Sequence, residues 1–147
     1  MAAQIRFAQD GDLAGVHQLY RALRPHDPEL APDVARARWR ELTGQPHLGI
    51  VVADADGTLA ATCMIATLPN LASGGRPIGL IEHVVTLPAF RGQGLARQVM
   101  VHALDFAWSR DCCKVMLLSG ARRTEAHRLY AALGFDGDAE RGFVIKP

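Results

Sequence analysis

The sequence lacks the features that mark a secreted, membrane-spanning or nucleic-acid-binding protein. Its 147 residues include three cysteines, two of them adjacent, and an odd number does not suit a disulfide framework. No apolar run approaches the roughly 18 residues that span a bilayer, and the first residues lack the basic start and apolar core of a signal peptide. Sixteen basic and fifteen acidic residues nearly cancel, so no basic tract favours nucleic acid. We expect a cytoplasmic protein with a small-molecule partner, no nucleic acid and no membrane.

What the sequence does contain is a regular order of strand and helix patterns. A hydrophobic content of 49% supports one substantial core, so we expect a single domain over residues 1–147. The order of elements predicts a mixed α/β sheet with helices on both faces. The expected strands cover 5–8, 48–53, 58–67, 80–87, 114–118, the region near 135 and 143–145, and the expected helices cover 13–23, 33–42, 95–109 and 124–133.

The most informative stretch, Arg-Gly-Gln-Gly-Leu-Ala over residues 91–96, joins an apolar strand to an amphipathic helix. The N–H groups of a helix's first turn have no internal partners, and the helix dipole adds positive charge there, so this position favours a phosphate. Gly92 and Gly94 would let the backbone close around it, although a purely structural turn is the alternative. A dinucleotide fingerprint would need a glycine where Arg97 stands, and a Walker-type loop would need a Gly-Lys-Ser/Thr ending, so neither fits.

The strand 80–87 carries the next candidate residues. Strand alternation predicts that Glu82 and His83 lie on opposite faces of the sheet. A carboxylate among apolar neighbours is costly unless it is paired or used, and burial makes a carboxylate more basic. Glu82 is therefore a candidate general base, with a structural ion pair as the alternative. His83 is interpreted as a hydrogen-bonded structural histidine or as an alternative base.

The pattern Arg/Gln-x-x-Gly-x-Gly/Ala is met by Arg91, Gly94 and Ala96, and with residues 81–86 and 126–135 the chain resembles the GNAT-type N-acyltransferase superfamily. The resemblance implies a mostly antiparallel central sheet of about six to seven strands with helices on both faces. It also implies acetyl-coenzyme A as co-substrate. No metal is expected, because the six histidines are scattered.

Within that superfamily the likeness is nearest to glucosamine-6-phosphate N-acetyltransferases. Two departures stand out. That family has Glu-Asp where this chain has Glu82-His83, and an Asp follows its fifth strand where this chain has Leu118-Ser119. Because a shared fold and cofactor site do not fix the substrate, the acceptor is left open.

The resemblance also implies roles for individual residues. Glu82 would take a proton from the attacking amine, and Tyr130 would assist the departing thiolate, although its helical spacing alone would place it in a core stripe. A backbone N–H at Val84 or Val85 would donate to the developing oxyanion. The residues expected to bind the cofactor are Val84, Val85, Thr86, Arg91, Gly92, Gln93, Gly94, Leu95 and Ala96.

By the same resemblance, the loop 24–32 would overhang the acceptor side of the site, although a solvated loop is the alternative. The predicted function is transfer of an acetyl group from acetyl-coenzyme A to a primary amine of a small molecule by direct attack. The alternatives are a protein or peptide N-acetyltransferase and a non-catalytic acyl-coenzyme A binding regulatory domain. A homodimer is left open. The residues expected to meet the acceptor are His26, Asp27, Glu29, His83, Arg122 and Lys146.

Overall fold

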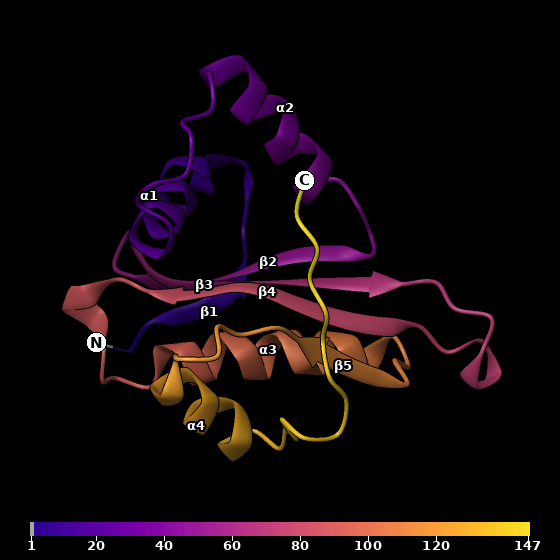
Figure 1. Cartoon of the computed structure of the whole chain (residues 1–147). Helices are drawn as coiled ribbons and strands as arrows, with labels where there is room; N and C mark the ends of the chain where they lie inside the picture. The colour runs from indigo at the N-terminus through magenta and orange to yellow at the C-terminus, as the bar shows by residue number, and fades with distance from the viewer. Residues whose placement is uncertain (1) are drawn as a thin grey trace. The chain divides into compact units, whose positions relative to one another are not determined.

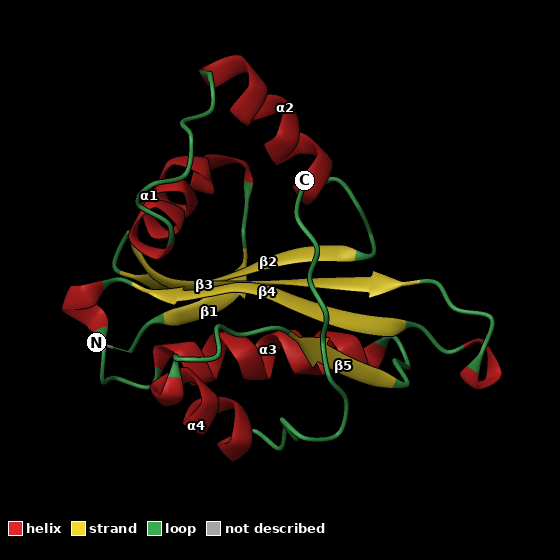
Figure 2. Cartoon of the chain, viewed as in Figure 1, coloured by secondary structure: helices red, strands yellow, loops and turns green. Residues whose placement is uncertain are grey.

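A five-stranded sheet forms the centre of the first part of the chain (Figures 1 and 2). The computed structural model describes residues 2–147, which divide into two units, one that ends at Met116 and one that runs from Leu117 to Pro147. The strands follow one another across the sheet in chain order, and the three pairings from β1 to β4 are antiparallel. The elements are β1 Gln4–Phe7, α1 Leu13–Leu23, α2 Pro32–Thr43, β2 Leu48–Ala55, β3 Thr58–Leu68, β4 Ile78–Thr86, α3 Leu95–Ser109, β5 Lys114–Leu117 and α4 Thr124–Ala132.

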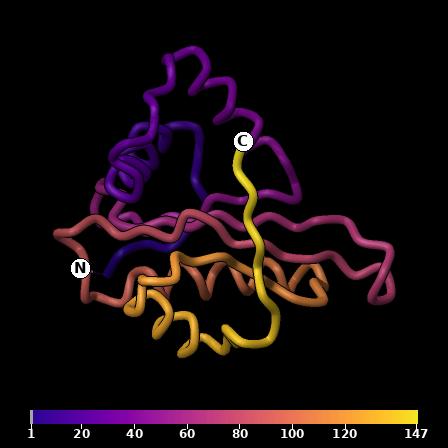
Figure 3. The backbone as a smooth tube through the Cα atoms, in the orientation of Figure 1, coloured from indigo at the N-terminus to yellow at the C-terminus, as the bar shows by residue number. Residues whose placement is uncertain are grey.

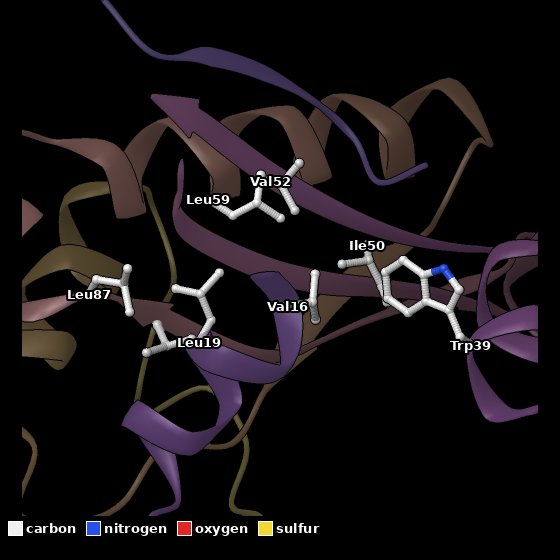
Figure 4. Close-up of a cluster of buried hydrophobic side chains, with 8 residues drawn as sticks. Val16, Leu19, Trp39, Ile50, Val52, Leu59 and Leu87 are labelled. Atoms are coloured by element: carbon white, nitrogen blue, oxygen red, sulfur yellow. The ribbon is translucent and has the colours of Figure 1, made fainter. Parts of the chain in front are cut away.

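Helices cover both faces of this sheet, as the order of elements predicts. Figure 1 shows α1 and α2 on one face and α3 on the other. Under α1 and α2 lies a buried apolar cluster (Figure 4). On the opposite face the Cys63 thiol of β3 lies 3.4 Å from the Val99 carbonyl of α3, so the two elements are in direct contact. The cluster in Figure 4 consists of Val16, Leu19, Trp39, Ile50, Val52, Leu59, Val85 and Leu87.

The tight turn between β2 and β3 follows from its sequence. Asp56 and Gly57 both have positive φ, at 52° and 91°, which defines the turn type whose twist matches a hairpin. The Asp54 carboxylate accepts a 2.8 Å hydrogen bond from the Gly57 N–H, which fixes the turn. The predicted hairpin is therefore confirmed.

The expectation of six to seven strands is wrong, because the described residues form five. The segment near Phe135 is not a strand: its N–H donates to the Tyr130 carbonyl at 3.0 Å, which ends α4, and the Asp138 N–H then donates to the Asp136 carboxylate at 2.9 Å. Residues 143–145 are apolar but exposed, so they have no buried face to fix a strand register. The prediction of a single domain stays a prediction.

A bulge interrupts the alternation of β4. Thr62 of β3 pairs with Val85, and Met64 pairs with Glu82, so two residues of β4 face Cys63 alone. Such an insertion bends the strand and leaves the extra residue outside the regular ladder. Val85 belongs to the buried cluster under α1 and Met64 packs against that cluster, so the side chain of Glu82, which pairs with Met64, lies on the α1 face.

An ion-pair cluster ties the first strand to the residues before α1. Arg6 donates to Asp12 at 2.7 Å and pairs with Asp54 at 3.0 Å, and the Gln9 N–H donates to Asp12 at 2.7 Å. The Arg6 hydrogen bond is the main cause that lowers the pKa of Asp12 below its ordinary value.

None of the helices formed by residues 2–147 combines the length and apolar character that a bilayer span requires.

Replacing Asp12 by Asn is expected to lower the free energy of unfolding by about 1 to 3 kcal/mol at pH 7, the usual contribution of hydrogen bonds to a charged group. Because the folded pKa is lowered, this stabilisation is complete above the unfolded value of 3.8 and is lost as pH falls through the folded value. Urea unfolding of both proteins should therefore show a difference that shrinks below pH 3.8. Asp10→Asn, an exposed neighbour, is the control.

Candidate active site

The loop after β4 ends in an open helix terminus. Gly92 and Gly94 both have φ of 76°, a conformation that side chains other than glycine rarely adopt, and a Cβ at either position would meet no atom within 4 Å. The Gln98 N–H donates to the Gly94 carbonyl at 3.1 Å, which begins α3 and leaves the preceding N–H groups without helical partners. Within residues 2–147, no side chain caps this end and no acid lies in its first turn. The terminus is therefore suited to an anion.

Glu82 lies in the β4 segment directly before the bulge. Its side chain is half-buried on the α1 face, and Val84 and Thr86, beyond it, are also half-buried. Val85 is buried in the cluster under α1. The structure thus places the candidate base and the candidate backbone donors on one short segment, which leads directly into the glycine loop.

The expectation that His83 faces away from Glu82 is wrong. Its backbone has a φ of 56°, so the regular alternation of the strand is broken at this residue. The imidazole ring packs on Tyr20 of α1, with ring centroids 4.9 Å apart and an interplanar angle of 49°. His83 and Glu82 therefore both face α1.

The surroundings of His83 disfavour the charged form of its ring. Burial is the main cause that lowers the pKa of His83 below its ordinary value; Arg24 lowers it further, whereas Glu82 and Asp27 raise it. Glu82 belongs to β4, whereas Arg24 and Asp27 belong to the loop after α1. Arg24 and Asp27 of the loop therefore lie near enough to the bulge for their charges to act on His83.

A cavity of about 740 Å³ lies between α1, α2 and the loop that joins them. Figure 3 follows the chain through this loop, from α1 to α2. Asp27 and Glu29, both predicted from the sequence, line the cavity, whereas His26 is exposed and is not part of its lining among residues 2–147. Tyr20 and Arg24 also line it and are not predicted as site residues. The helical spacing of Tyr20 assigns it to a core stripe. Only its contact with His83 in the structure connects it with the candidate site residues of β4.

The second unit carries three other candidates. Tyr130 is buried on α4, and its ring packs edge-on against Phe135 with centroids 6.1 Å apart. The His127 ring lies 2.9 Å from the Gly120 carbonyl, which fixes the loop before α4. Arg122 and Lys146 are exposed. The roles of Tyr130, Arg122 and Lys146 in catalysis or binding stay predictions.

Cys63 and Cys112 do not resemble nucleophiles. Burial raises the pKa of Cys63 to about 12 and also raises the pKa of Cys112. Because the thiolate is the reactive form, these residues are suited to packing. In the part of the chain that the structure describes, no three His, Cys, Asp or Glu side chains form a group that could hold a metal ion.

The family model described as "Acetyltransferase (GNAT) family" matches residues 15–135, which include most of both units. The chain belongs to the GNAT acetyltransferase family. The prediction that it is an acyltransferase enzyme is thereby confirmed.

Among named relatives, the chain is 33% identical to glucosamine 6-phosphate N-acetyltransferase 1 of Oryza sativa subsp. japonica, over 91% of this chain and 81% of that protein. It is 32% identical to glucosamine 6-phosphate N-acetyltransferase of Trypanosoma brucei brucei, but over only 54% of this chain and 52% of the relative, about half its length.

Solved structures share the whole fold. A putative acetyltransferase from Agrobacterium tumefaciens is 41% identical, with a TM-score of 0.92 over 98% of this chain and 99% of that one. An aminoglycoside N-acetyltransferase in complex with CoA has a TM-score of 0.83 over 99% of this chain and 94% of that one. At 23% identity, the latter likeness shows the fold alone.

Proposed function

We propose that this enzyme transfers the acetyl group of acetyl-coenzyme A to a primary amine of a small molecule by direct attack. The observation that carries the proposal is the β4–α3 connection, in which a half-buried carboxylate beside a bulge leads into an uncapped, glycine-led helix terminus. The carboxylate supplies a base, and the terminus supplies donors for a phosphate. Both parts of the chemistry are therefore held by one continuous segment.

The residues of this segment fit acetyl-coenzyme A. The N–H groups from Gly92 to Ala96 would bind its pyrophosphate, because the open space around the two glycines allows close approach. The backbone of Val84, Val85 and Thr86 would hydrogen-bond the amides of the pantetheine arm. The CoA complex of the aminoglycoside acetyltransferase, which shares the fold, supports this assignment.

In the transfer step, the amine nitrogen bonds to the carbonyl carbon and the carbon–sulfur bond breaks. Glu82 takes a proton from the attacking nitrogen, directly or through one water. The N–H of Val84 or Val85 donates to the carbonyl oxygen as it becomes negative. Tyr130 assists the leaving sulfur by donating a hydrogen bond.

The cavity at the α1–α2 loop is the proposed acceptor site. Its lining combines acidic residues, Asp27 and Glu29, with basic ones that include Arg24 and Arg36. A small molecule with both a cationic amine and an anionic group matches this combination of charges. Glucosamine 6-phosphate, which the names of two relatives described above contain, is a molecule of this kind.

Measurement of acetyl-coenzyme A consumption with amino sugar phosphates, polyamines, amino acids and peptides tests the proposal. We expect turnover with a small anionic amine, and mass spectrometry should find the acetyl group on its nitrogen. Turnover confined to peptides would establish the peptide N-acetyltransferase alternative and contradict the small-molecule assignment.

Replacing Asp27 by Asn is expected to raise the acceptor KM about fivefold, because one favourable charge pair at a solvent-exposed site is worth roughly 1 kcal/mol. The KM for acetyl-coenzyme A should not change. Steady-state kinetics with each substrate varied in turn measures both constants. Asp33→Asn, at an exposed position that does not line the cavity, is the matched control, and an equal change in both variants would contradict the role of Asp27.

A further inference from the structure

His83 holds a backbone conformation that side chains other than glycine rarely adopt. Its φ of 56° lies in the left-handed region, and the residue stands at the bulge where β4 has one residue too many. Such conformations are strained and persist where the surrounding structure enforces them, often at functional sites. The strain directs the imidazole onto the α1 face, next to Glu82.

The contacts of the ring connect it with the acceptor cavity. Tyr20, on which it packs, is itself part of the cavity lining, and so is Asp27, whose charge acts on the imidazole. His83 is half-buried and is not itself part of the cavity lining among residues 2–147, so Tyr20 is its contact with that lining. A path of adjacent groups therefore runs from the cavity through Tyr20 and His83 to Glu82.

The proton balance of the proposed reaction leaves a role for a second acceptor. An ammonium nitrogen carries three protons and the product amide carries one, so two protons leave. One of them ends on the coenzyme A sulfur and the other is released to water. Glu82 holds only one proton at a time, so a second group beside it would allow the ammonium form of the amine to react near neutral pH.

We propose that His83 is this second proton acceptor: its neutral imidazole takes a proton from the bound ammonium before attack and passes it to water. Glu82 then takes the next proton as the carbon–nitrogen bond forms. The inference rests on the proposed function and makes His83 a catalytic residue at the acceptor nitrogen.

The charged and titratable groups around the ring fit this role. Glu82 adjoins it on β4, Tyr20 packs on it from α1, and Arg24 and Asp27 act on it from the loop after α1. The Cys63 thiol of the neighbouring β3 is directed to α3 instead. Burial raises the pKa of Tyr20 to about 12 and that of Cys63 to about 12, so neither competes for a proton near pH 7. The two carboxylates stabilise the imidazolium that forms, and Arg24 favours its release of the proton.

The test is the pH dependence of kcat/KM in His83→Asn, because Asn tolerates a positive φ and carries no titrating group. At pH 7 we expect a loss of about 10²-fold, typical of a missing general base, with acetyl-coenzyme A affinity unchanged. The wild-type enzyme should show a plateau near neutral pH, whereas in the variant kcat/KM should rise about tenfold per pH unit as the free amine forms. His102→Asn, whose ring packs on Phe7 away from the site, is the matched control.

A second variant, His83→Gly, relieves the backbone strain and leaves space for a ring. Imidazole added to the solution should restore part of its activity, and this result carries the test if His83→Asn does not fold. A loss in His83→Asn that is equal at every pH, together with no rescue of His83→Gly, would show a structural role and overturn the inference. Unaltered kinetics of His83→Asn would overturn it too, whereas no turnover by the wild-type enzyme with any amine would contradict the proposed function.

Discussion

Replacing Glu82 by Gln is expected to lower kcat by about 10² to 10⁴, the usual contribution of a positioned general base. The amide keeps the size and shape of the carboxylate but cannot take the proton of the attacking nitrogen. The half-buried position of Glu82 on the α1 face, beside the bulge, is the structural reason to expect that it takes the proton itself. Stopped-time assays of acetyl-coenzyme A consumption at saturating substrate would measure the change.

Two comparisons separate this effect from a loss of structure. Calorimetric titration should give the same Kd for acetyl-coenzyme A in Glu82→Gln and the wild-type enzyme, because the pyrophosphate is held elsewhere. Glu41→Gln removes an exposed carboxylate on α2, paired with Arg38 at 3.0 Å, and should retain full activity. If Glu82→Gln leaves the rate and the pH profile unchanged, Glu82 is not the general base and its role is structural.

The start of α3 could be predicted from the sequence because its causes are local. Glycine at position 94 supplies the positive φ that precedes the helix, and apolar residues at helical spacing follow it. The helix begins at Leu95 and ends at Ser109, as predicted. The β2–β3 hairpin was predictable for the same reason, since Asp54 and Gly57 determine the turn between themselves.

The face of the sheet on which the His83 side chain lies could not be predicted, because its cause is not local. Alternation assumes a regular ladder, and the bulge in β4 arises from its pairing with β3, about twenty residues earlier in the chain. The contact with Tyr20 likewise depends on how α1 packs over the sheet. The missing strand at 143–145 shows the converse: an apolar pattern alone does not make a strand without a neighbour that pairs with it.

The glycine loop leads to the prediction with the largest expected effect on binding. Replacing Gly94 by Val is expected to raise the Kd for acetyl-coenzyme A about 10- to 100-fold. A change of this size corresponds to the loss of about one charge-assisted hydrogen bond. Two causes contribute: valine is strained at a φ of 76°, and its branched side chain would fill the open space in front of the helix N–H groups.

The two causes can be separated by a second substitution at the same position. Gly94→Ala adds a single methyl group at the same φ, so it reports strain with little obstruction, and we expect its Kd to lie between those of the wild-type enzyme and Gly94→Val. Gly137→Val places the same side chain at another open position, where no positive φ is required, and is the matched control. Calorimetric titration with acetyl-coenzyme A measures all four proteins, and thermal unfolding checks that each is folded. If folded Gly94→Val binds acetyl-coenzyme A as tightly as Gly137→Val does, the pyrophosphate does not lie on the N-terminus of α3.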